Sequence, residues 1–180
     1  QAIPSSLQDN PLILRLRKSY TEPKVWPKKS VVIFTGNNAI GEWGPWSLDE
    51  GIGGSEEAIV RLSRRLSEQG YEVHVYANPG ARAGAYQGSK PFVFDPAFDV
   101  DNHSVTWHNY WELDMRDTFD VFVAWRSPWF FDADVKARKT YLWLHDVMEP
   151  GEFTPERLAK IDKVIVLSKY HRSLFPNIPD

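Results

Sequence analysis

The sequence contains no cysteine, which excludes disulfide bonds and thiolate chemistry and fits a reducing compartment. It has no uninterrupted apolar run near the roughly 20 residues that a membrane-spanning helix requires. The N-terminus also lacks the pattern of a signal peptide. These absences predict a cytoplasmic protein without a transmembrane segment, and they leave peripheral contact with a membrane open.

A surplus of basic charge is also missing. The chain has 21 Lys and Arg against 24 Asp and Glu, which gives a formal net charge of -3 at pH 7. We therefore expect no nucleic-acid partner, because such proteins depend on a basic field. Aromatic residues, in contrast, are frequent at 14%, with 8 Trp. We expect most of them in the core, while the surplus also suits stacking on sugars or bases.

With 180 residues, the chain is long enough for one domain with its own core. Residues 1–30 mix prolines with polar residues, which predicts an N-terminal arm. The apolar run from Leu12 to Leu16 within this arm is expected to pack on the body of the protein. Residues 31–180 are predicted to form the domain itself.

The domain is organised around residues 51–57, which read GIGGSEE. They follow a strand candidate, Val31–Thr35, and close a loop over residues 36–54 in which we expect no regular structure. Glycines before a helix let backbone N–H groups approach a ligand, and the helix dipole favours oxygen-rich groups there. An ordinary surface turn is the alternative, because Gly-x-Gly-Gly alone is a weak signal.

An amphipathic helix is predicted over residues 55–69, with Ser55 as its N-cap and Gly70 directly after its end. Strand Glu72–Ala77 follows, so the opening unit is a right-handed βαβ crossover, which implies parallel strands. The apolar face of the helix is expected to contain Ala58, Ile59, Leu62 and Leu66.

Further strands are predicted at residues 105–110, 120–125, 139–144 and 162–167, with a short one at residues 92–94. Thr154 is predicted to cap a helix that runs to about Ile161, and Ser168 to cap a short helix that stops at Pro176. The sequence therefore predicts an α/β, Rossmann-like three-layer domain with a mostly parallel sheet.

In such open sheets, ligands bind outside the carboxyl ends of the strands. His145 is the candidate catalytic residue, because a neutral imidazole beside Asp146 could bond a substrate hydroxyl. A structural role is the alternative for His145, and it is the expected role of His74, His103 and the exposed-looking His171. The candidate substrate-binding residues collected from the strand ends are Gly53, Gly54, Ser55, Glu56, Arg126, Asp146, Ser168 and Lys169.

Three other kinds of site are disfavoured. His103, His108 and His145 show no short ligand spacing, so we predict no metal. Neither Ser55 nor Ser168 lies in a Gly-x-Ser-x-Gly elbow, which argues against a serine triad. A dinucleotide site is disfavoured as well, because a long loop separates the glycines from the first strand and the second strand lacks a terminal acid.

Three motifs resemble a known family in their identity and order. They are GGSE at residues 53–56 with the strand GYEVHV at 70–75, YLWLHD at 141–146, and DKVIVLSKYHR at 162–172 followed by LFP. Together they resemble the N-terminal domain of GT-B glycosyltransferases, in particular the glycosyltransferase family 4-like retaining enzymes. The resemblance covers residues 31–180 and leaves the N-terminal arm without a counterpart.

The resemblance implies a hexosyltransferase-like enzyme that moves a sugar from a nucleotide-sugar to an acceptor (glycan, lipid or protein) without metal or other cofactor. It implies that Gly53 and Gly54 face the donor's phosphates or the acceptor, that His145 bonds the reacting groups, and that Ser168 and Lys169 line the same cleft. The family's second domain, which holds most of the nucleotide-sugar site, is missing from this sequence. We therefore expect an acceptor-side half that is inactive alone; the alternative is a non-catalytic glycan-binding or partner-docking module.

Overall fold

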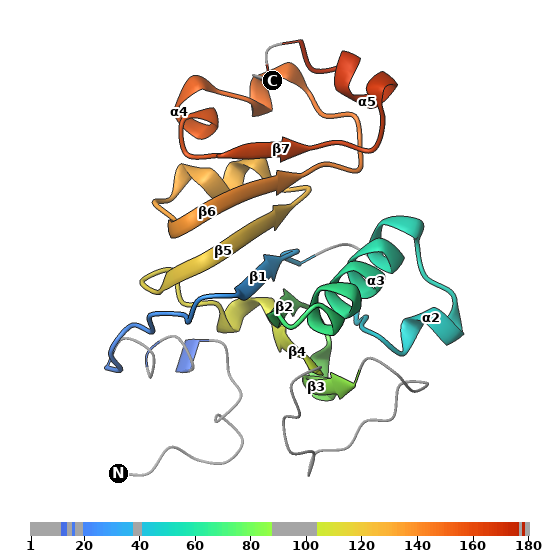
Figure 1. Cartoon of the computed structure of the whole chain (residues 1–180), viewed down its shortest axis with the longest axis vertical. Coiled ribbons are helices and arrows are strands. Elements are labelled where there is room, and N and C mark those ends of the chain that lie inside the picture. Colours follow the sequence, from blue (N-terminus) through green and yellow to red (C-terminus); the bar gives the residue numbers. More distant parts are fainter. Residues whose placement is uncertain are drawn as a thin grey trace.

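The structure is a computed structural model that describes residues 12, 13, 16, 20–37, 41–87, 104–176 and 178. It is an α/β fold on a seven-stranded sheet with the order β3-β4-β2-β1-β5-β6-β7 (Figure 1). All pairings are parallel except the antiparallel one between β3 and β4. The predicted fold class is therefore confirmed. The strands are β1 (Ser30–Phe34), β2 (Glu72–Ala77), β3 (Gly84–Gln87), β4 (Ser104–Asn109), β5 (Thr118–Trp125), β6 (Lys136–Trp143) and β7 (Lys163–Ile165).

The helices are short except for one, which covers residues 54–68. The α-helices are α2 (Ser47–Glu50), α3 (Gly54–Glu68), α4 (Pro155–Leu158) and α5 (Lys169–Ser173), and the 3-10 helices are η2 (Gly80–Arg82), η3 (Tyr110–Glu112), η4 (Pro128–Asp132) and η5 (Pro150–Glu152). Thr154 caps α4 and Ser168 caps α5, each by accepting a backbone N–H, as predicted. The strands and caps were predictable because β-branched runs and Ser/Thr caps are local signals.

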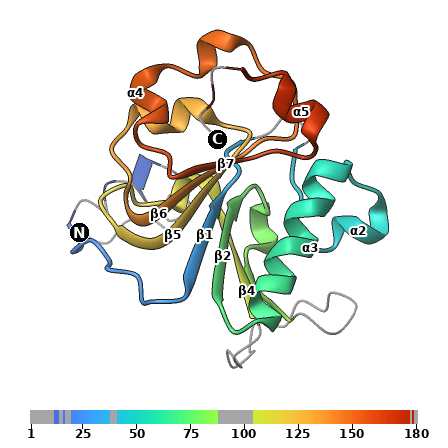
Figure 2. The same ribbon diagram turned by 45° about the horizontal axis from the view of Figure 1, so that its top comes forward.

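The sheet separates two apolar clusters and so forms the middle of three layers. On one face α3 packs mainly on β2 and β4. On the other face, side chains such as Phe122 and Leu142 pack with Phe131 of η4 and Phe175, which follows α5. Figures 1 and 2 show α3 on one side of the sheet and α4 toward the other. Because these strands are parallel, their carboxyl ends lie along one common edge of the middle layer.

Helix α3 differs from its prediction in two respects. Its N-cap is Gly53, without a side-chain cap, so Ser55 lies within the first turn and does not cap the helix. Its buried face contains Ile59, as predicted, but otherwise consists of Glu56, Val60, Ser63 and Ser67, whereas Ala58, Leu62 and Leu66 are only half-buried. Serine is small enough to face the sheet in a closely packed helix. The periodicity of apolar residues does not detect such positions. Gly70 has φ +80°, as expected after a helix end.

Two connections also differ from the sequence-based expectation. The loop before α3, predicted to be without regular structure, contains α2 and the buried Trp43, which is 1% exposed. Strand β3 was not predicted, because its sequence GAYQ has no β-branched residue and depends on pairing with β4. The predicted strand at residues 92–94 lies outside the described residues.

The N-terminal arm packs through a different segment from the predicted one. Leu12 and Leu16 are 70% and 60% exposed, so these two side chains are not packed into the body. Instead Trp26 is 6% exposed, and Val25 forms a parallel bridge with Thr118. The arm is thus attached by residues just before β1. Within the described residues, no helix is long and apolar enough to cross a membrane.

Candidate functional site at the carboxyl ends of the strands

Arg126 follows β5 directly and has an unusual backbone. Its φ is +57°, in the left-handed region that residues other than glycine rarely adopt. Its N–H donates to the carbonyl of Trp143 at 2.9 Å, so β6 holds this turn in place. Strained residues of this kind cost about 1–3 kcal/mol and cluster at functional sites. In Figure 1 the arrowheads of β5, β6 and β7 point toward the side where α5 lies and α3 begins.

The Arg126 guanidinium joins two carboxylates from different elements. Glu56, in the first turn of α3, is 5% exposed, and its Oε1 lies 3.6 Å from an Arg126 nitrogen. Asp146, which follows β6, forms a close ion pair with the Nε of Arg126 and is half-exposed. The same guanidinium lies 4.8 Å from the ring of Trp125. Glu56, Arg126 and Asp146, three of the predicted substrate-binding residues, are therefore brought together.

The glycine stretch has a different role from the one expected of a phosphate loop. A Cβ added at Gly53 would lie 2.5 Å from Oε2 of Glu56, so the chain's own carboxylate occupies that space. A Cβ added at Gly54 would meet nothing within 4 Å. A carboxylate at the helix start is stabilised by the helix dipole, and it opposes a phosphate at the same place. The site therefore suits a neutral, hydroxyl-bearing ligand better than a free pyrophosphate.

His145 lies beside this ion-paired cluster, and its ring contacts two indole rings. The centroid of its ring is 4.6 Å from that of Trp143 and 5.7 Å from that of Trp125. Burial lowers the pKa of His145 from its usual 6.5, and the nearby Arg126 lowers it further, whereas Asp146 raises it. The imidazole is therefore neutral at pH 7. Its Nε2 is buried and has no hydrogen-bond partner among the described residues, and the same holds for Nε1 of Trp125.

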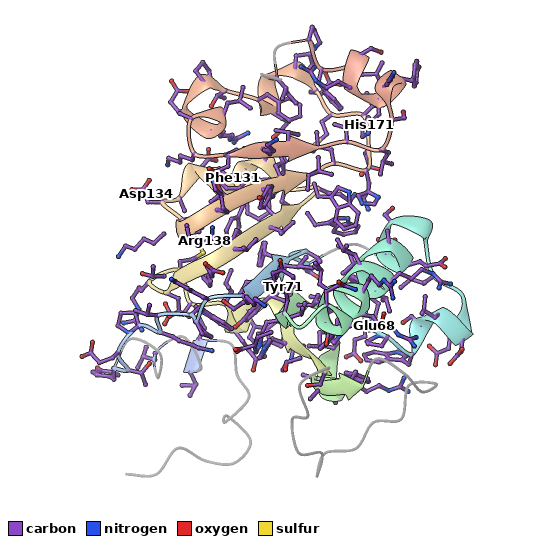
Figure 3. All side chains as sticks on the ribbon, in the orientation of Figure 1. Glu68, Tyr71, Phe131, Asp134, Arg138 and His171 are labelled. Atoms are coloured by element: carbon purple, nitrogen blue, oxygen red, sulfur yellow. The ribbon has the colours of Figure 1, made fainter. Side chains whose placement is uncertain are left out.

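His171 connects α5 to the loop that carries His145 and Asp146. Its Nδ1 accepts the backbone N–H of Leu167 at 3.2 Å, so its Nε2 bears the hydrogen and donates to the carbonyl of Asp146 at 3.0 Å. Figure 3 labels His171 on α5, on the side to which the strands point. The residue is 7% exposed, so its exposed appearance in the sequence was misleading. Its structural role, however, agrees with the expectation.

The remaining predicted site residues are less involved. The Ser168 hydroxyl accepts the N–H of His171 at 3.0 Å and is therefore used as a helix cap. Lys169 is exposed at the start of α5, and within the described chain no hydrogen bond or ion pair joins it to the cluster. Ser55 is half-buried inside the first turn of α3. None of these three side chains forms an ion pair with Arg126, Asp146 or Glu56 in the described part of the chain.

Two other histidines, His74 and His108, lie close together on neighbouring strands. His74 Nδ1 lies 2.8 Å from His108 Nε2, and His74 Nε2 lies 3.0 Å from Glu72, on strands β2 and β4 and away from His145. No group of three or more metal-ligating side chains occurs in the part of the chain that the structure describes. His103 lies outside the described residues.

Comparison with protein families, with curated proteins and with solved structures finds no match for this chain. The functional argument therefore depends on the site itself. The cluster combines two carboxylates, one guanidinium and a neutral imidazole with an unused ring nitrogen. Such groups can donate to and accept from the hydroxyls of a polar, uncharged ligand.

Proposed function

We propose that this chain is the acceptor-side half of a GT-B-type glycosyltransferase. In this proposal a second Rossmann-like domain supplies most of the nucleotide-sugar site, and the strand-end cluster holds the hydroxyl-bearing acceptor. The observation that carries the proposal is His145, a neutral imidazole with a buried and unused Nε2 beside the Arg126–Asp146 pair. The resemblance of the motifs at residues 53–56, 141–146 and 162–172 supports the same assignment.

The proposed chemistry is positioning and hydrogen bonding. Nε2 of His145 bonds an acceptor or transferred-sugar hydroxyl, while Asp146, which is half-exposed, accepts a second hydroxyl. Arg126 holds Asp146 and Glu56 in place, since it pairs with both. Oriented groups of this kind lower a barrier because they need no reorganisation when the substrates react.

A first test titrates the 180-residue chain calorimetrically with UDP-, GDP- and dTDP-sugars. We expect dissociation constants of roughly millimolar or weaker, because most donor contacts belong to the second domain and Glu56 opposes a phosphate at Gly53. No sugar transfer by the chain alone is expected. Micromolar binding of any donor would place the donor site on this half and contradict the proposed division of roles.

A second test measures sugar transfer by the enzyme that carries this chain together with its donor domain. His145→Ala is expected to lower turnover about a hundredfold, the usual effect of removing one hydrogen-bonding group from a reaction centre. His145→Gln, which retains a side-chain donor and acceptor, is the matched control and should recover part of the activity. Unchanged turnover in His145→Ala with unchanged unfolding would remove His145 from the mechanism.

A non-catalytic glycan-binding module is the second candidate. The exposed apolar side chains Ile165 and Leu167 on β7 and just after it favour it, because such residues mark binding surfaces. This function predicts sugar binding by the chain but no transfer with or without a donor domain. The transfer assay above therefore decides between the two.

A further inference from the structure

On the α3 side of the sheet, β6 and β7 lack a covering helix within the described residues. α3 packs mainly on β2 and β4, and the views show β6 and β7 lying beyond it (Figures 1 and 2). Parallel strands are normally covered on both faces. Apolar side chains are exposed here, since Ile165 is 41% and Leu167 is 56% accessible. This uncovered part of the face is a candidate binding surface.

Strand β6 carries a row of aromatic rings along this surface. Tyr141 and Trp143 pack with the α3-side cluster, whereas Leu142 between them belongs to the cluster on the other face. Both aromatic side chains are only half-buried. Alternate residues of a strand are about 6.6 Å apart, so His145 continues the same row just after the strand. The row therefore leads directly into the strand-end site, because His145 belongs to both.

Polar groups border the row at each end. At the far end, Lys163 is the register partner of Tyr141, and Lys139 Nζ lies 2.7 Å from an oxygen of Asp162. At the near end, Arg126 pairs with Asp146. These aromatic side chains have polar tips and lie between hydrogen-bonding groups. They therefore suit a ligand whose own rings have apolar faces and hydroxyl groups at their edges. A sugar chain has this chemistry along its whole length.

We propose that Tyr141, Trp143 and His145 form a platform for a linear glycan that runs from the strand-end site along β6. Ile165 and Leu167 lie beside the platform and contact the same chain. The assignment rests on the proposed function and extends it, because it names an oligosaccharide as the acceptor.

The test measures the affinity of the 180-residue chain for neutral malto-, cello- and chito-oligosaccharides from disaccharide to hexasaccharide, by calorimetry and tryptophan fluorescence. For one of these series, affinity should rise with length by about three- to tenfold for each aromatic ring reached. Tyr141→Ala should remove the gain from the longest members and leave disaccharide affinity unchanged. Trp129→Ala is the matched control, because Trp129 is 51% exposed on η4, away from the platform.

The outcomes separate this proposal from the function on which it rests. Equal affinity for all lengths, or no binding of any oligosaccharide, would overturn the platform, whereas the His145 transfer assay independently decides the function. A chain that is dimeric in sedimentation analysis and becomes monomeric on Leu167→Asp would show that the surface joins two copies. That result would also overturn the platform. Length-dependent binding that survives Trp129→Ala but not Tyr141→Ala supports it.

Discussion

The two ends of the parallel sheet use carboxylates in different ways. At the amino ends, Asp117, Asp120 and Asp162 each accept a backbone N–H, from Lys24, Lys29 and Thr140 respectively. Asp120 and Asp162 add ion pairs with Arg138 and Lys139 to these bonds, and at the carboxyl ends Glu56 and Asp146 both pair with the one side chain of Arg126. Figure 3 labels Arg138, the partner of Asp120, and His171 near opposite ends of the strands. The backbone bonds at the amino ends attach the segments before β1 and within β6 to neighbouring parts of the chain, whereas Arg126 joins two carboxylates by side chains alone.

Buried hydrogen-bonding groups in the two regions differ in whether a described residue satisfies them. Asp117 accepts both the Lys24 N–H at 2.7 Å and the Trp26 indole N–H at 3.0 Å. At the carboxyl ends, Nε2 of His145 and Nε1 of Trp125 are buried without a partner among the described residues, and so is Oγ of Ser104 at the amino end of β4. Such unsatisfied groups are costly for folding and are retained where a ligand or water satisfies them. Nε2 of His145 and Nε1 of Trp125 therefore keep a hydrogen-bonding capacity that no described residue uses.

The largest effect is expected at the amino ends. Asp117→Ala should lower the free energy of unfolding by about 3 kcal/mol, because the buried indole N–H of Trp26 and the part-buried N–H of Lys24 lose their acceptor. Denaturant unfolding measures this change, and ligand binding by the folded fraction should be unaffected. Asp134→Ala is the control, since its side chain is 89% exposed and solvent screens its ion pair with Lys160. Similar losses in both variants would contradict the structural role of Asp117.

An intermediate effect is expected from two residues other than glycine that have left-handed backbones. Lys29 has φ +65° at the amino end and Arg126 has φ +57° at the carboxyl end. Lys29→Gly should stabilise the protein by about 0.5–1 kcal/mol without changing sugar binding. Arg126→Ala should destabilise by about 1–2 kcal/mol, because Glu56 and Asp146 lose their partner, and Arg126→Gly should recover about half of that loss. Both Arg126 variants should lose sugar binding. Sugar binding that is retained would show that Arg126 is not part of the site.

A smaller effect distinguishes the adjacent glycines of the GGSE motif. Gly53→Ala should destabilise by about 1 kcal/mol, because its Cβ would displace the Glu56 carboxylate from the helix start. Gly54→Ala should stabilise by about 0.5–1 kcal/mol, since its Cβ meets nothing and the residue begins a helix. Thermal unfolding measures both. If Gly54→Ala nevertheless weakens ligand binding, the ligand approaches the backbone at that residue.

The smallest effect is a difference in pH dependence between the two ends. The pKa of His145 is lowered by burial, so its contribution to stability is present above pH 6.5 and is lost as the pH falls through its folded-state pKa. The pKa of Asp120 is lowered by Arg138, so its contribution is lost only in more acidic solution, as the pH falls below 3.8. Unfolding midpoints followed from pH 7.5 to pH 3 should therefore show less loss between pH 6.5 and pH 5 in His145→Gln than in the unmodified protein. An identical profile would show that His145 is not buried in its neutral form.

The sequence determined the α/β sheet and which residues belong to the candidate site. Apolar runs such as Asp120–Trp125 predict buried parallel strands, and polar residues placed directly after them must lie along one edge of the sheet. For that reason Arg126, His145 and Asp146 were predictable as neighbours before any contact was known. Local caps, at Thr154 and Ser168, were predictable on the same grounds.

Only the tertiary structure decided how those residues are used. Arg126 pairs with Glu56, and His171 bonds the loop after β6; both contacts join elements that are distant in sequence. The four-residue β3 exists through its pairing with β4, which no local propensity encodes. How much of β6 and β7 the described helices cover is likewise a property of how far α3 extends across the sheet. Periodicity tells which side of a strand is apolar, but packing alone decides whether another layer covers it.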